Sequence, residues 1–76
     1  MRIDLLGRHH IRADEVNGKS YWVLKDICEA MNLMQKDLIH ELGDKLVTTS
    51  IKIDSDQGDV YMTAVDHDSV CAIIDI

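Results

Sequence analysis

Residues 15–33 read Glu-Val-Asn-Gly-Lys-Ser-Tyr-Trp-Val-Leu-Lys-Asp-Ile-Cys-Glu-Ala-Met-Asn-Leu, and this stretch decides the fold. Asn17-Gly18 predicts a two-residue hairpin turn, because both central residues of such a turn adopt positive φ. The Tyr-Trp-Val run over 21–23 is typical of a strand. The next apolar residues follow at the spacing of one helix face: Leu24, Ile27, Cys28 and Met31. The stretch therefore predicts a hairpin that runs directly into a short amphipathic helix, with the only tryptophan of the chain at the join.

The rest of the chain extends this pattern to an α+β fold. Strand signals occur near residues 3–6, 11–16, 20–23, 45–54 and 60–62. Helix signals cover residues 24–32, 35–42 and 66–75. This order predicts a single domain over residues 1–76, in which a small antiparallel sheet of two hairpins packs with three short helices.

The ends and faces of the later helices carry their own signals. In the middle helix we expect Gly43 to be the C-terminal stop and three residues to point inward: Leu38, Ile39 and Leu42. Thr63-Ala-Val-Asp66 matches the pattern for a helix start and predicts the last helix. That helix is expected to place three apolar residues on one side: Val70, Ile73 and Ile74.

Charge is distributed unevenly along the chain. The formal net charge is −6, yet residues 1–52 carry eight acidic and eight basic side chains, whereas residues 53–76 carry six aspartates and no Lys or Arg. A negative surface is repelled by phosphate and attracted to basic protein surfaces, although a solvated acidic face that aids solubility explains the same pattern. From this clustering we predict a protein-contact surface made of five carboxylates: Asp54, Asp56, Asp59, Asp66 and Asp68.

Catalytic and metal-binding motifs are missing from the sequence. Cys28 and Cys71 both lie in apolar helical patterns, so we expect buried thiols and a reducing, cytoplasmic location. The histidines (His9-His10, His40 and His67) and the cysteines form no pair with C-x-x-C or H-x3-H spacing. We therefore expect no enzyme activity, no cofactor and no metal. An apolar run long enough for a membrane span is also missing.

The two helices predicted over residues 24–32 and 35–42 have the outline of a helix-turn-helix. The second helix offers Gln35, Lys36, Asp37, His40 and Glu41, so its polar face is nearly neutral. Binding to DNA draws most of its non-specific affinity from Lys and Arg. We therefore favour two helices packed on a sheet and do not expect direct nucleic-acid binding.

The C-terminal residues Ile73, Ile74 and Ile76 predict a homodimer seam. A regular helix cannot place all three isoleucines on the same inward face. A domain of this size also has a marginal core unless something else stabilises it. Association of two copies through these isoleucines would cover the side chain that cannot point inward and would also stabilise the small core.

The stretch 17–33 resembles the BRO N-terminal (BRO-N) domain family, whose members typically read G-x-x-W-F-V-A-K-D-V-C-x-A-L-G-Y here. The matching residues are Gly18, Tyr21 or Trp22, Val23, Lys25, Asp26, Ile27, Cys28, Ala30 and Met31. A later run, residues 62–74, is similar to the I-N-E-x-G-L-Y-x-L-I segment of the family. The resemblance spans about residues 11 to 74 and implies a BRO-N-like fold.

Such domains occur in phage antirepressors and large-DNA-virus proteins, usually before a second domain. Because this chain ends after the first domain and is acidic, the resemblance implies a short, stand-alone prophage antirepressor. We expect it to bind a phage transcriptional repressor and prevent it from binding operator DNA, which promotes lytic induction. The alternative is a DNA-binding BRO-type transcriptional regulator that uses helix 35–42. A fragment of a longer protein, with its activity in a missing domain, is a third reading.

Overall fold

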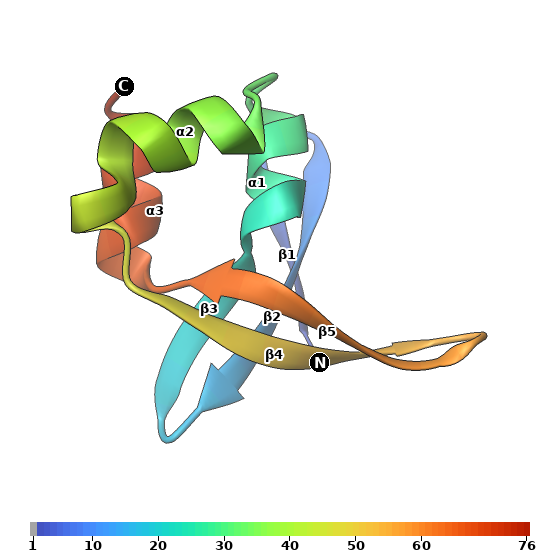
Figure 1. Cartoon of the computed structure of the whole chain (residues 1–76). Coiled ribbons are helices and arrows are strands. Elements are labelled where there is room, and N and C mark those ends of the chain that lie inside the picture. The colour runs from blue at the N-terminus through green and yellow to red at the C-terminus, as the bar shows by residue number, and fades with distance from the viewer. Residues whose placement is uncertain (1) are drawn as a thin grey trace.

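The computed structural model describes residues 2–76 and has the predicted α+β architecture. Its elements in chain order are β1 (Arg2–Leu6), β2 (His9–Val16), β3 (Lys19–Val23), α1 (Leu24–Ala30), α2 (Gln35–Leu42), a 3-10 helix (Gly43–Lys45), β4 (Thr48–Ser55), β5 (Gly58–Val65) and α3 (His67–Ile74). The five strands form one antiparallel sheet in the order β1-β2-β3-β5-β4. The three helices lie together on one side of the sheet (Figure 1).

The stretch 15–33 folds as its sequence predicts. Asn17 and Gly18 have φ of 53° and 81°, the positive values that a two-residue hairpin turn requires. Helix α1 ends two residues earlier than predicted, because Asn32 adopts φ 56°. The Leu33 amide then donates to the Cys28 carbonyl at 2.8 Å, and the Asn32 amide donates to the Glu29 carbonyl at 3.3 Å. These are the two hydrogen bonds of a Schellman motif, here with asparagine in the position that glycine usually takes.

The main core lies between the helices and the sheet. It consists of Ile11, Leu24, Ile27, Cys28, Leu38, Leu42, Val65 and Ile73. Each helix contributes to this cluster and so covers its apolar face against the strands. Three predicted orientations are nevertheless wrong or incomplete: Ile39 is 46% exposed, Ile74 is 47% exposed, and Cys71 lies on the outer side of α3.

The sheet bends where the β1–β2–β3 meander meets the β4–β5 hairpin (Figure 1). Strands β3 and β5 share only two residue pairs, Trp22 with Val65 and Val23 with Ala64, whereas β4 and β5 are paired along their whole length. The β4–β5 hairpin therefore runs across β2 and β3, and its tip extends beyond the rest of the molecule (Figure 1). A second cluster fills the crossing and consists of Val23, Ile51, Ile53 and Ala64.

Two predicted strand boundaries are wrong for local reasons. Helix α2 has its predicted bounds, but Gly43 adopts φ −47° and continues the chain into the 3-10 helix instead of turning left-handed, so β4 begins at Thr48 and not at Lys45. Thr63 lies inside β5, which runs to Val65 because its residues stay paired with β4. Helix α3 is capped by Asp66, whose carboxylate accepts from the Ser69 amide.

Candidate protein-binding surface

The five predicted contact carboxylates fall into two separate groups. Asp54, Asp56 and Asp59 lie at the tip of the β4–β5 hairpin, whereas Asp66 and Asp68 lie at the start of α3. Strand β5 connects the two groups, and the seven residue steps from Asp59 to Asp66 span about 24 Å at the rise of an extended chain. One continuous surface of all five carboxylates is therefore not formed.

The hairpin tip concentrates exposed negative charge. All three of its aspartates are exposed, and Asp54 pairs directly with Asp59 across the two strands. The Lys52 ammonium lies 2.9 Å from the Asp59 carboxylate and offsets one of the charges. Gly58 adopts φ 107° at the turn, where the Ser55 hydroxyl donates to its carbonyl. The turn therefore fixes the strand register that brings Asp54 and Asp59 together.

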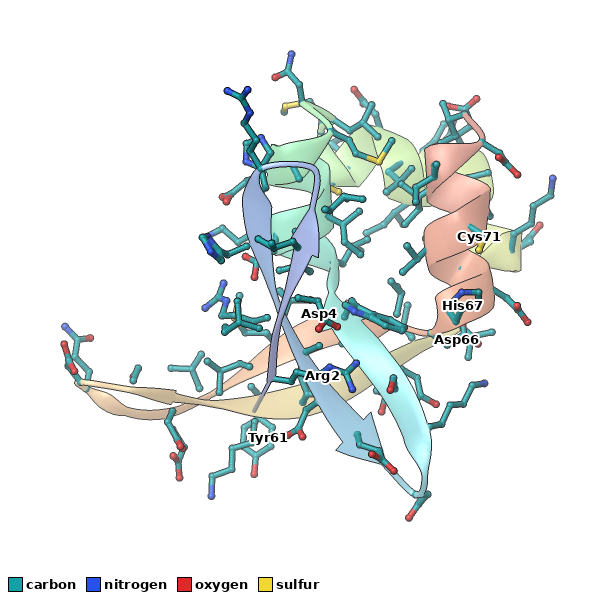
Figure 2. The ribbon with its side chains drawn as sticks, turned by 180° about the vertical axis from the view of Figure 1, so that it is seen from behind. Arg2, Asp4, Tyr61, Asp66, His67 and Cys71 are labelled. Atoms are coloured by element: carbon teal, nitrogen blue, oxygen red, sulfur yellow. The ribbon has the colours of Figure 1, made fainter. Side chains whose placement is uncertain are left out.

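An aromatic side chain adjoins these carboxylates. Tyr61 pairs with Lys52 across the hairpin and is 70% exposed. Because alternate residues of a strand share one face, these two residues lie on the same side of the hairpin as Asp54 and Asp59. We name these four residues, Lys52, Asp54, Asp59 and Tyr61, the hairpin face. The position of Tyr61 is shown in Figure 2.

Asp66 does not belong to an accessible surface. It is only 2% exposed, and one of its oxygens accepts from the Ser69 amide at 2.9 Å and the Ser69 hydroxyl at 2.6 Å. The other oxygen lies 3.0 Å from the Lys19 ammonium. The hydrogen bonds from Ser69, assisted by Lys19, lower the pKa of Asp66 to about 2 against the opposing effect of burial. Asp66 thus caps α3 and ties it to the β2–β3 hairpin, whereas its neighbour Asp68 is exposed.

Asp26 is a second buried carboxylate, and it connects helix α1 to strand β2. It lies on α1 and accepts from the Arg12 backbone amide at 3.0 Å and from the Arg12 guanidinium at two places, both 2.8 Å. The last β2–β3 residue pair is Ala13 with Trp22. Beyond this pair the chain continues into α1, and the Arg12 amide donates to the Asp26 side chain. Burial alone raises the pKa of Asp26, but its bonds to Arg12 outweigh this and lower it overall.

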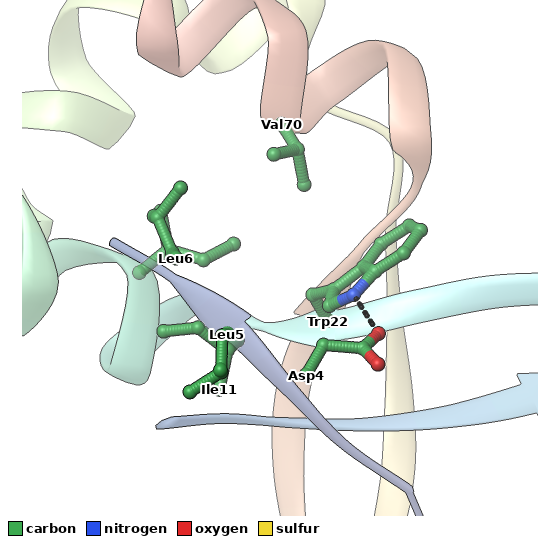
Figure 3. A pocket seen from close by; sticks show the side chains of 7 residues that line it. Asp4, Leu5, Leu6, Ile11, Trp22 and Val70 are labelled. Atoms are coloured by element: carbon green, nitrogen blue, oxygen red, sulfur yellow. Dashed lines mark hydrogen bonds between the residues drawn. The ribbon is translucent and has the colours of Figure 1, made fainter. Parts of the chain in front are cut away.

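The tryptophan at the join lines a pocket between β1, the sheet and α3. Its indole N–H donates to the Asp4 carboxylate at 2.8 Å (Figure 3), and the same carboxylate oxygen lies 3.0 Å from Nε of Arg2. The cavity measures about 390 Å³ and is lined by Asp4, Leu5, Leu6, Ile11, Trp22, Ile27 and Val70. The sequence predicted that Trp22 lies at the join of sheet and helix, but it gave no indication that Asp4 accepts from its indole. That contact depends on the pairing of β1 with β2.

Helix α2 presents a mixed surface to solvent. Its exposed charged residues are Lys36, Asp37 and Glu41, with His40 beside them. Leu38 and Leu42 hold the helix against the core. An isolated lysine among two carboxylates gives no basic patch that would attract phosphate.

The predicted dimer residues separate in the structure. Ile73 is completely buried and belongs to the core, so it cannot form an intermolecular seam. Ile74 and Ile76 are 47% and 55% exposed and remain available. The described part of the chain, residues 2–76, contains no helix that is long and apolar enough to cross a membrane.

Comparison of the chain with protein-family models, with curated proteins and with solved structures finds no match. The similarity to BRO-N domains therefore depends on the quoted residues alone and stays a prediction.

Proposed function

We propose that this protein is a prophage antirepressor that binds a phage transcriptional repressor in the cytoplasm and prevents it from binding operator DNA. The carrying observation is the direct pairing of Asp54 with Asp59 at the tip of a projecting hairpin. Like charges placed opposite each other destabilise a sheet, and among residues 2–76 the cation that offsets one of them is Lys52. A cationic partner would relieve the repulsion that the fold itself leaves.

The DNA-binding face of a repressor is such a partner. It is basic because it neutralises phosphates, so an acidic hairpin competes with DNA for the same side chains. Tyr61 adds an exposed aromatic surface on the hairpin face, and tyrosine is enriched in the centres of protein interfaces. An arginine of the repressor can contact Tyr61 and a neighbouring carboxylate at the same time.

The BRO-N resemblance supports the scaffold of this proposal. The second glycine of the quoted family pattern falls on Asn32, which adopts the left-handed conformation that glycine favours. Asp26, another residue of the pattern, holds β2 to α1. We further propose a homodimer through the exposed Ile74 and Ile76, because a two-fold assembly matches the symmetry of a typical repressor dimer.

The test is a competition experiment with the repressor of the same prophage and its operator DNA. Wild-type protein is expected to release the repressor from DNA without binding the DNA itself. The triple variant D54N/D56N/D59N is expected to weaken repressor binding at least ~10-fold, about 1.4 kcal/mol.

A matched control changes the same net charge at another exposed place. Asp37, Glu41 and Asp44 are exposed on α2 and the 3-10 helix, so D37N/E41Q/D44N also removes three negative charges. This control should keep repressor binding within about threefold of wild type, because long-range charge effects are modest at physiological salt. Equal loss in both variants would contradict a specific hairpin contact. Tight binding of wild type to bare DNA would instead favour the alternative, a DNA-binding regulator that uses helix 35–42.

A further inference from the structure

His67 and Cys71 form an exposed pair on the outer side of α3. The Cys71 sulfur lies 3.8 Å from Nδ1 and 3.9 Å from Nε2 of His67, one helical turn earlier. Figure 2 shows both side chains on the same side of the helix. The sequence predicted that Cys71 is buried, so its exposure makes a thiol available that the fold does not use.

The separation of the two donor atoms suits one metal ion. Zinc binds thiolate sulfur at ≈ 2.3 Å and imidazole nitrogen at ≈ 2.0–2.1 Å, so two adjacent ligands of a tetrahedral ion lie about 3.6 Å apart. The 3.8 Å between Sγ and Nδ1 is close to this separation. Because the sulfur is almost equally far from Nε2, the imidazole must rotate to direct one ring nitrogen at a shared ion, and its exposure leaves room for that rotation. The Asp68 carboxylate, 3.8 Å from Nδ1 of His67, adds negative charge that attracts a cation.

One chain supplies only part of a coordination shell. Among residues 2–76, no group of three or more His, Cys, Asp or Glu side chains is placed to hold a metal ion. Two protein ligands leave two tetrahedral positions open, and a second His–Cys pair would fill them as a His₂Cys₂ set. Ile74 lies one turn beyond Cys71 and is exposed, so an approach of two α3 helices would also cover apolar surface.

We infer that His67 and Cys71 bind Zn²⁺ or a similar borderline-soft divalent ion that is shared between two copies of this chain. The thiol of each Cys71 releases its proton to solvent when the sulfur–metal bond forms. The ion links the outer sides of two α3 helices. Strand β5 separates this site from the hairpin face. The inference does not depend on the proposed repressor binding, but it shares the exposed Ile74 with the proposed homodimer.

The experiment titrates the full chain, kept reduced, with Co²⁺ and Zn²⁺ alone. Wild type is expected to bind one ion per two chains, with a thiolate-to-cobalt charge-transfer band. Binding should also quench the fluorescence of Trp22, the only tryptophan, whose ring centre lies 6.2 Å from that of His67. Zn²⁺ should displace Co²⁺ and abolish the band.

Variants locate the site. Cys71→Ser should abolish the charge-transfer band, and His67→Ala should weaken binding at least ~10-fold. His40→Ala removes an exposed histidine from α2 and should leave binding unchanged. Because the three side chains are exposed, all variants should keep the wild-type circular dichroism spectrum. Binding that survives in the C71S/H67A double variant, or a stoichiometry of one ion per chain, would overturn the inference.

Discussion

The carboxylates of the body and those of the β4–β5 hairpin differ in what surrounds them. Asp26 and Asp66 are buried, and each accepts hydrogen bonds from a backbone amide and from a neighbouring side chain. Asp54, Asp56 and Asp59 are exposed, and two of them face each other. Sequence clustering placed Asp66 with the hairpin group, but its surroundings place it with Asp26.

This difference separates stability from recognition. A buried carboxylate with several donors holds elements together, since its loss leaves those donors without a partner. An exposed carboxylate that faces a like charge contributes little to folding and is free to meet a cationic partner. Substitutions in the two groups should therefore have opposite consequences for the free energy of unfolding and for binding.

The largest loss of stability is expected for Asp26→Ala. It removes the acceptor for the Arg12 amide and guanidinium, and we expect the free energy of unfolding to fall by about 2 to 3 kcal/mol. This is less than the about 3 to 5 kcal/mol typical of a broken buried pair, because the Arg12 side chain is partly exposed. Urea unfolding followed by Trp22 fluorescence measures this change. The control Glu29→Ala, at an exposed position of the same helix, should stay within about 0.5 kcal/mol of wild type.

Asp66→Ala should have the next largest effect. The substitution removes the cap of α3 and its link to Lys19, and we expect a loss of about 2 kcal/mol, at the upper end of the range for capping residues. Asp68→Ala is the matched control, because Asp68 lies two residues away and its side chain is fully solvated. Similar losses in the two variants would contradict the conclusion that Asp66 stabilises the fold by capping α3 and pairing with Lys19.

Most of the fold follows from local signals in the sequence. The turn at Asn17-Gly18, the helix that begins at Leu24 and the bounds of α2 are each decided by a few adjacent residues. Helix α3 begins within one residue of its predicted start, but Thr63 does not cap it, because pairing with β4 keeps Thr63 in strand β5. Periodicity could not decide between Ile73 and Ile74, since the answer depends on which side of α3 meets the core.

The candidate sites were less predictable because they depend on contacts between distant residues. The sequence grouped carboxylates by proximity along the chain, whereas Asp66 is buried and bonded to Lys19 and Ser69 and so does not belong to the exposed group. The pairing of Asp54 with Asp59 requires the hairpin register, which Gly58 sets at the turn. The exposure of Cys71 depends on the rotation of α3 about its axis, and the apolar pattern around it indicated the opposite.

Lowering the pH should remove the charge of the buried carboxylates without changing the size of their side chains, and so should test how much that charge stabilises the fold. The pKa of Asp66 is about 2 in the folded protein, below its ordinary value of 3.8, so its contribution is complete above pH 4 and is lost as pH falls towards 2. We expect roughly 1 to 2 kcal/mol from Asp66, reduced by solvent around Lys19. Asp26 adds to the same slope, because its pKa is also lowered.

Urea unfolding at several pH values measures this slope, with Asp66→Asn as the variant and Asp68→Asn as its control. Asp66→Asn should flatten the fall in stability between pH 4 and pH 2, since an amide does not titrate. Asp68→Asn should keep the wild-type slope. An unchanged slope in Asp66→Asn would show that its carboxylate is not held in the charged form by the fold.

The smallest effect, and the opposite in sign, is expected for Asp54→Asn. Because Asp54 faces Asp59 across the hairpin, removing its charge should raise the free energy of unfolding by about 0.2 to 0.5 kcal/mol. The gain should shrink in high salt, which screens exposed charges. Asp59→Asn gives the comparison: it relieves the same repulsion but also loses the ion pair with Lys52, so the two effects should nearly cancel. A loss of more than about 1 kcal/mol in Asp54→Asn would place this residue with Asp26 and Asp66, and would remove the main reason to treat the hairpin carboxylates as a binding surface.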